Sequence, residues 1–230
     1  MGSPFFIADA FTSVPFGGNP AAVCMLNEDV SSSWMQSIAA ETFLSETAFI
    51  QSGTGSRLNL RWFTPTVEVD LCGHATLASA LVLWSEERVP ISKSIEFETK
   101  SGLLSAKRVG DGIALDFPSI PSRSIEVLPD LQDSLGIDPL WAGTAGDDLL
   151  IEVDDPVLVK NLQPNFSKLS TVDTRRGVIV TAKGDTDGSA DFVSRFFAPR
   201  FGINEDPVTG SAHCALGPYW GSRLGKQELN

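Results

Sequence analysis

Two stretches of this chain repeat one another, and the repeat constrains the fold more than any other feature of the sequence. Residues 61–65, RWFTP, are echoed by residues 195–199, RFFAP. Within fifteen residues of each arginine the chain reaches a glycine that opens an apolar stretch, Gly73-His74-Ala75 in the first copy and Gly210-Ser211-Ala212 in the second. A shared unit of strand, loop and buried helix in each half predicts two related lobes.

The first lobe is predicted to span residues 1–118 and to be a sheet wrapped on a buried helix. Short strand-like runs alternate with turns, and the stretch near 73–87, GHATLASALVLWSEE, is apolar on nearly every side at its centre. A helix with that pattern must be enclosed by other elements. A Pro/Ser-rich segment from about 118 to 129 marks the boundary with the second lobe.

A further helix is predicted after the serines at positions 31–33. Serine is a preferred N-cap, and Trp34, Ile38 and Phe43 fall roughly on one face of the run that follows.

The second lobe is predicted to span residues 119–230, with its central helix near 209–224. In the first lobe more than thirty residues of strand-like sequence follow Trp84, whereas the chain continues for ten residues after Trp220. We therefore expect the second lobe to lack the matching hairpins and to be C-terminally incomplete relative to the first.

Charge and composition argue against several classes of function. The net charge is −12 and no Lys/Arg cluster forms a basic face, so we expect no nucleic-acid partner; Arg175-Arg176 reads as the polar entrance to a strand. No apolar run is long enough to cross a membrane, and we expect no signal peptide, because the first residues carry no basic segment and place Asp9 inside the apolar stretch. Three cysteines without a CxxC pair indicate a reducing compartment, and hence the cytoplasm.

The two predicted helix starts are candidate substrate-binding sites. Gly73 and Gly210 each open a helix, where backbone N–H groups and the positive end of the helix dipole favour an anion. If the lobes pack pseudo-symmetrically, both starts point into one cleft that would hold a carboxylate. Ser211 lacks an obvious activating base, so it is expected to donate a hydrogen bond to the substrate rather than to act as a nucleophile.

Three residues are candidates for acid/base chemistry. Glu46 lies between a helix end and an apolar strand, where partial burial would raise its pKa; the alternative is a surface glutamate. His74 lies near a helix start, where the dipole disfavours imidazolium; the alternative is a capping or core histidine. Asp206 precedes Pro207 and is either a catalytic carboxylate or the N-cap of the helix.

Cys72 offers a different chemistry, because a helix start also lowers the pKa of a thiol. No metal site is predicted, since His74 and His213 are isolated in the sequence and no HxH or HExxH spacing occurs. No glycine-rich nucleotide loop occurs either, so we expect no cofactor.

Four stretches of the chain resemble the signatures of the phenazine-biosynthesis PhzF-like family, whose fold is that of diaminopimelate epimerase. They are DAFTSVPFGGNPAAV, LSETAF, RWFTPTVEVDLCGHATLASA and RFFAPRFGINEDPVTGSA, in that order from position 9 to position 212. The resemblance looks closest to the eukaryotic PhzF-domain-containing branch. It implies two lobes, each a β-barrel-like sheet around a central helix, with the site between them, and pairing into a homodimer.

The resemblance also implies the roles of the site residues. The family's acid/base glutamate falls on Glu46, its helix-start histidine on His74, and its second-lobe aspartate and serine on Asp206 and Ser211. The function predicted first is a cofactor-independent isomerase that acts on a small carboxylate-bearing metabolite. The alternatives are a non-catalytic binding or interaction protein and a thiol-based racemase that uses Cys72.

Overall fold

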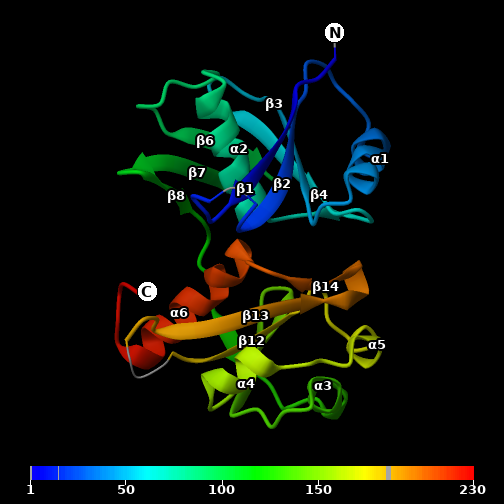
Figure 1. The fold of residues 1–230 in the computed structure, drawn as a ribbon, viewed down its shortest axis with the longest axis vertical. Helices are drawn as coiled ribbons and strands as arrows, with labels where there is room; N and C mark the ends of the chain where they lie inside the picture. The colour runs from blue at the N-terminus through cyan, green and yellow to red at the C-terminus, as the bar shows by residue number, and fades with distance from the viewer. Residues whose placement is uncertain (1, 15, 185–187) are drawn as a thin grey trace. The chain divides into compact units, whose positions relative to one another are not determined.

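The computed structural model describes residues 2–14, 16–184 and 188–230. The chain divides into two compact units, residues 1–117 and residues 118–230; the sequence placed the division after residue 118. Each unit contains one mixed sheet with helices on its faces (Figure 1).

The described residues of unit 1 form one curled sheet and two helices. The strand order is β1-β2-β3-β4-β6-β7-β8, and β5 pairs with β4. Its elements are β1 (Phe5–Ala10), β2 (Asn19–Met25), α1 (Ser32–Thr42), β3 (Thr47–Ser52), β4 (Leu58–Phe63), β5 (Glu68–Val69), α2 (Gly73–Ser85), β6 (Ile95–Thr99), β7 (Gly102–Val109) and β8 (Gly112–Asp116).

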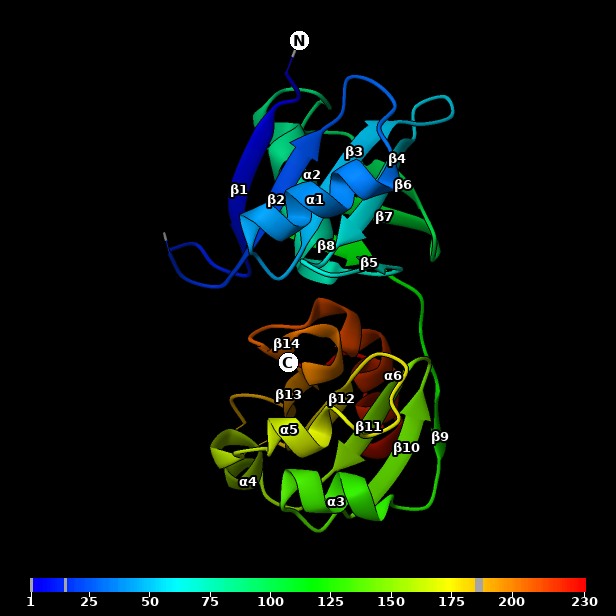
Figure 2. The same cartoon turned by 90° about the vertical axis from the view of Figure 1, so that its right-hand side faces the viewer.

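The curled sheet of unit 1 has a helix on each face (Figure 1 and Figure 2). Successive residues of a strand point to opposite faces, and β3 shows this division. Ala48 and Ile50 pack in the cluster that contains α2, whereas Phe49 packs with Met35 and Ala39 of α1. The predicted central helix is α2, which is enclosed by the sheet and contributes buried residues along most of its length.

Unit 2 contains a six-stranded sheet, counted over the described residues, in the order β14-β13-β12-β11-β10-β9. Its elements are β9 (Ser122–Ser124), α3 (Pro129–Leu135), β10 (Trp141–Ala145), β11 (Asp148–Glu152), α4 (Pro156–Asn161), α5 (Phe166–Leu169), β12 (Val178–Lys183), β13 (Phe192–Ala198), η1 (Pro199–Phe201), β14 (Ile203–Asp206), η2 (Gly210–Ala212) and α6 (His213–Leu224).

The sheet of unit 2 is also covered on both faces. Leu150 and Ile179 pack with Trp220 of α6, whereas Ile151 and Val180 pack in the cluster formed with α3, α4 and α5. The same alternation along the strands therefore separates one central helix from the outer helices in each unit.

The internal repeat is visible in the side-chain contacts of the two units. Arg61 forms a bidentate pair with Glu68 and lies over the ring of Phe63 at 5.1 Å. Arg195 pairs in the same way with Glu205, and its guanidinium lies 4.9 Å from the ring centroid of Phe197. Each copy thus ties the strand that carries the arginine to the short strand that follows.

The predicted α+β fold class is confirmed, with two sheets of which the first curls as a half-barrel around α2. Strands β6 to β8 follow α2 in unit 1, whereas no strand follows α6 among the described residues of unit 2. No helix in the described part of the chain has the length and apolar character to cross a membrane.

Candidate functional site

Glu46 reaches its position through a sharp turn at the end of α1. Phe43 adopts a left-handed conformation with φ of 56° and donates its backbone N–H to the carbonyl of Ala39, which ends the helix. The chain then enters β3 directly after Glu46, whose backbone carbonyl accepts a hydrogen bond from the amide of Ala22 at 3.3 Å. The backbone of Glu46 is therefore fixed by the sheet, while its side chain leaves the strand end.

The start of α2 brings two further reactive side chains to the same place. Cys72 occupies the N-cap position with an extended backbone, Gly73 is the first helical residue, and His74 is the second. His74 is 1% exposed, so its ring is surrounded by protein.

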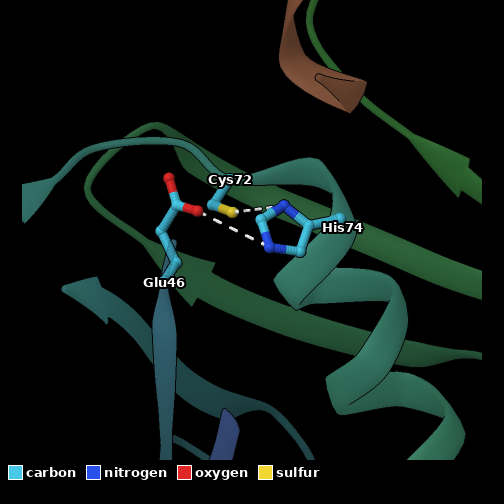
Figure 3. Close-up of side chains that lie close together, drawn as sticks. All are labelled: Glu46, Cys72 and His74. Atoms are coloured by element: carbon cyan, nitrogen blue, oxygen red, sulfur yellow. Dashed lines mark hydrogen bonds and ion pairs between the residues drawn. The ribbon is translucent and has the colours of Figure 1, made fainter. Parts of the chain in front are cut away.

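Glu46, Cys72 and His74 form one cluster in unit 1 (Figure 3). Glu46 Oε2 lies 3.5 Å from His74 Nε2, and Cys72 Sγ lies 3.5 Å from His74 Nδ1. The Glu46 side chain is 13% exposed, so its burial is partial, as the sequence suggested. The structure thus brings together Glu46, Gly73 and His74, which were predicted as site residues, and adds Cys72.

Ser45 and Asn19 complete the surroundings of the histidine, and the sequence reasoning missed both. Ser45 Oγ lies 3.3 Å from His74 Nε2, and the Ser45 hydroxyl donates to Asn19 Oδ1 at 3.4 Å. Because Ser45 donates its own hydrogen to Asn19, His74 satisfies this contact as a donor from Nε2. Nδ1 is then the acceptor that faces the Cys72 thiol.

Burial keeps the His74 imidazole neutral. It lowers the pKa of His74 from 6.5 to about 4, because the charged form would lose its hydration. A neutral imidazole beside Glu46 can donate and accept hydrogen bonds without holding the carboxylate in a strong ion pair.

The cluster also contains atoms of the kinds that bind metals, and these lie within 4.8 Å of one another. Cys72 and Glu46, however, approach different nitrogens of the His74 ring. One ion would have to lie about 2.0–2.3 Å from each donor atom, so it could bind only one of these two nitrogens. The contacts suit proton transfer better than metal coordination, and the absence of a metal site stays a prediction.

Unit 2 carries the remaining predicted residues, and here one sequence interpretation is wrong. Asp206 is not the N-cap of the helix, because it still pairs with Phe196 as the last residue of β14. Thr209 occupies the N-cap position of η2, which Gly210 opens, and Asp206 Oδ2 accepts a hydrogen bond from the Thr209 hydroxyl at 2.5 Å. Asp206 therefore fixes the loop before the helix rather than the helix itself.

Ser211 follows Gly210 and takes part in a buried ionic network that the sequence did not reveal. Arg176 Nη1 donates to Ser211 Oγ at 2.8 Å, and the same guanidinium forms a bidentate pair with Asp148. Arg176 was interpreted only as the polar entrance to a strand. The contact spans 35 positions and depends on tertiary structure, so the sequence around Arg176 carries no local signal for it.

Comparisons with known proteins agree with this architecture. The family model described as phenazine biosynthesis-like protein (PhzC-PhzF) matches residues 8–230. An uncharacterized isomerase of Halalkalibacterium halodurans is 52% identical over 230 residues, covering 100% of this chain and 86% of that protein. A human phenazine biosynthesis-like domain-containing protein is 42% identical over 252 residues, covering 100% of this chain and 87% of that protein.

A solved structure shows the same fold. The crystal structure of a PhzF-family protein from Enterococcus faecalis matches with a TM-score of 0.88 and 46% identity, covering 100% of this chain and 86% of that one. The fold is that of the PhzF and epimerase-type proteins and belongs to the α+β class. This chain belongs to the phenazine biosynthesis-like (PhzC-PhzF) family, as its four signature stretches indicated.

Bacterial and animal proteins are both among its relatives, and of the two named here the bacterial isomerase shares the larger identity. Membership of the family, together with the isomerase names of relatives, supports an isomerase-type function for this chain.

Proposed function

We propose that this protein is a cofactor-independent isomerase that relocates a proton on a small carboxylate-bearing metabolite, with Glu46 as the acid and base. The observation that carries the proposal is the contact between the Glu46 carboxylate and the buried, neutral His74 at the start of α2. A partly buried carboxylate on a fixed backbone is suited to accept a proton and to return it.

The proton balance needs no other reactant. The Glu46 carboxylate accepts a proton from one carbon atom of the substrate, and the electron pair of that C–H bond moves into the conjugated system. The resulting carboxylic acid, which is partly exposed and can exchange its proton with solvent, then gives one proton to a second carbon atom. Substrate and product have the same composition, and Glu46 returns to its starting state.

His74 assists because it is neutral. A cationic imidazole at 3.5 Å would stabilise the Glu46 carboxylate and weaken it as a base. The neutral ring instead lets Glu46 alternate between its charged and uncharged forms. We further propose that Asp206 assists the transfer, and that the backbone amides at Gly73, Gly210 and Ser211 bind the substrate carboxylate.

The test is proton exchange in D₂O with the Glu46→Gln variant. Wild-type protein is incubated with a panel of small unsaturated carboxylic acids, including cyclohexadiene carboxylates, and proton NMR records loss of C–H signals and formation of isomers. Removing the acid/base group is expected to lower the rate at least 10²- to 10⁴-fold. Glu41→Gln is the matched control, because Glu41 is exposed on nearby α1.

Two results would contradict the proposal. One is a Glu46→Gln variant that retains wild-type exchange, and the other is saturable binding of these acids to wild-type protein without any exchange. The second result would favour the non-catalytic binding protein. Pairing into a homodimer stays a prediction, which light scattering of the purified chain can test.

The thiol-based racemase is the second candidate function, and one observation favours it. Cys72 Sγ lies beside His74 Nδ1, which is placed to accept the thiol proton. Unit 2, however, has Thr209 at the N-cap position that Cys72 occupies in unit 1, and Cys214 lies buried within α6. A racemase with one thiol from each repeat is therefore less well supported than Glu46 chemistry.

A further inference from the structure

The pairing registers of the two sheets show which residues of the repeats correspond. Thr47 pairs with Phe63 in unit 1, and Val178 pairs with Phe197 in unit 2. The two phenylalanines stand two positions after the repeated arginines. Ser45-Glu46, which precede Thr47, therefore correspond to Arg176-Gly177, which precede Val178.

In both units the residue two positions before this strand contacts the second residue of the helix start. Ser45 Oγ lies 3.3 Å from His74 Nε2 in unit 1. Arg176 Nη1 lies 2.8 Å from Ser211 Oγ in unit 2. The contact is therefore present in both units with different groups. The Ser45 hydroxyl of unit 1 is replaced by the Arg176 guanidinium in unit 2, and the His74 imidazole is replaced by the Ser211 hydroxyl.

The residue of unit 2 that corresponds to Glu46 is Gly177, and its neighbours leave no room for a side chain as they stand. A Cβ atom on Gly177 would lie 2.3 Å from the ring of Phe196 and 2.9 Å from the carbonyl oxygen of Phe197. A side chain there would have to push the Phe196 ring aside and press on the Phe197 carbonyl, and with glycine at this position unit 2 has no counterpart of the acid/base group. The charged group that unit 2 offers at this place is Arg176.

Arg176 is held rigidly by its neighbours. Asp148 is 3% exposed and accepts a hydrogen bond from Arg176 Nε at 2.8 Å, a second from Nη2, and one from the amide of Gly177 at 3.1 Å. The guanidinium also lies 5.4 Å from the ring centroid of Phe196. A fork fixed in this way can present Nη1 to Ser211 in one geometry only.

The contact with Arg176 determines what the Ser211 hydroxyl can do. A guanidinium has donors and no acceptor, so Ser211 Oγ must accept this hydrogen bond, and its own hydrogen must point elsewhere. Ser211 is 4% exposed, and no acceptor for this hydrogen is found in the described part of the chain. A buried hydroxyl with its hydrogen left to donate matches an anionic ligand group.

We infer that Arg176, locked by Asp148, is a positioning residue that fixes Ser211 as a hydrogen-bond donor to the carboxylate of the substrate. The inference rests on the proposed function and deepens it by naming the group in unit 2 that would recognise the anion and the residue that orients it.

The test is a double-mutant cycle read by the affinity for anthranilate, with aniline as the matched probe that lacks the carboxylate. Calorimetric titration at pH 7.5 compares wild type, Arg176→Lys, Ser211→Ala and the double variant. Arg176→Lys keeps a charge beside Asp148 but loses the fork. Arg175→Lys is the control, because Arg175 is exposed and lies next to Arg176 in the sequence.

Arg176→Lys and Ser211→Ala are each expected to weaken anthranilate binding roughly 5- to 20-fold, as for loss of one charge-assisted hydrogen bond. The double variant is expected to be no weaker than Ser211→Ala alone, and Arg175→Lys is expected to match wild type. The inference would be overturned if Arg176→Lys weakened anthranilate binding by the same factor in the wild-type background and in the Ser211→Ala background. It would also be overturned if the wild-type protein bound anthranilate no more tightly than aniline.

Two further measurements control for misfolding of the Arg176→Lys variant and for failure of the proposed function. Circular dichroism reports whether Arg176→Lys is folded; if it is not, Ser211→Ala decides alone, and unchanged anthranilate affinity in that variant overturns the inference. Glu46→Gln separates this inference from the proposed function, because it should abolish proton exchange and preserve anthranilate affinity. Loss of carboxylate binding thus appears as weaker anthranilate affinity, whereas loss of acid/base chemistry appears as slower proton exchange.

Discussion

The buried imidazole of His74 makes the stability of unit 1 depend on pH in a way that can be calculated. The pKa of this side chain is 6.5 when exposed and about 4 in the folded protein. Between these values the unfolded chain binds a proton that the folded chain resists, so stability falls as the pH falls. Each pH unit across this window costs about 1.4 kcal/mol, giving a total loss of about 3 kcal/mol between pH 6.5 and pH 4.

The measurement is urea unfolding of wild type and His74→Gln at a series of pH values from 7.5 to 4, followed by tryptophan fluorescence. The substitution itself changes stability at every pH, so the quantity compared is the change in unfolding free energy with pH. Wild type is expected to lose about 3 kcal/mol more than His74→Gln across the window. His213→Gln is the matched control, because His213 is the other histidine of the chain and is exposed.

Parallel curves for wild type and His74→Gln would refute this reasoning. They would show that the folded protein takes up a proton at His74 as readily as the unfolded chain does. The neutral histidine in the proposed mechanism would then have no support at mildly acidic pH.

Two further predictions concern the remaining differences between the repeats. Gly177→Ala is expected to destabilise the protein by about 1–3 kcal/mol in thermal or urea unfolding, because the added methyl group overpacks against Phe196. Gly112→Ala, where the nearest atom is a carbonyl oxygen at 3.5 Å, should differ from wild type by less than about 0.5 kcal/mol, and similar losses in both variants would contradict the packing argument. Cys72→Ser is expected to keep proton exchange within a few-fold of wild type, and a loss of more than about 100-fold would favour the thiol racemase.

The repeat was predictable from the sequence because its two copies share an arginine, aromatic residues and a glycine-opened helix. The contacts of Arg61 with Glu68 and of Arg195 with Glu205 explain why these residues recur, since each pair joins neighbouring strands. Such a pattern can be recognised from the sequence because the paired residues lie close together along the chain.

The end of α1 shows the limit of a periodic pattern. Trp34, Ile38 and Phe43 were predicted to lie roughly on one face of this helix. Ile38 packs beside the buried Met35 and Ala39, and the Trp34 ring meets Phe49 of the sheet edge-on at 6.3 Å. Phe43 is instead the left-handed residue that ends the helix, so it does not continue the helical period and is largely exposed.

The candidate site was predictable only in part. Glu46 and His74 were candidates from their positions at a helix end and a helix start, the family resemblance implied their roles, and the structure places them 3.5 Å apart. Ser45 was passed over although it is adjacent to Glu46, and Arg176 was passed over because its partners Asp148 and Ser211 lie 28 and 35 positions away. Ionic networks of this kind are set by strand register, which no local pattern encodes.

The crowding around Gly177 has an evolutionary consequence. In the genetic code a glycine triplet can become a glutamate triplet by one nucleotide change, so a second acid/base carboxylate is always close at hand for a duplicated gene. Here the aromatic ring of Phe196 stands where that side chain would have to begin. A single change at Gly177 is therefore not enough to give unit 2 a second acid/base carboxylate, because the Phe196 ring and the Phe197 carbonyl would have to give way as well.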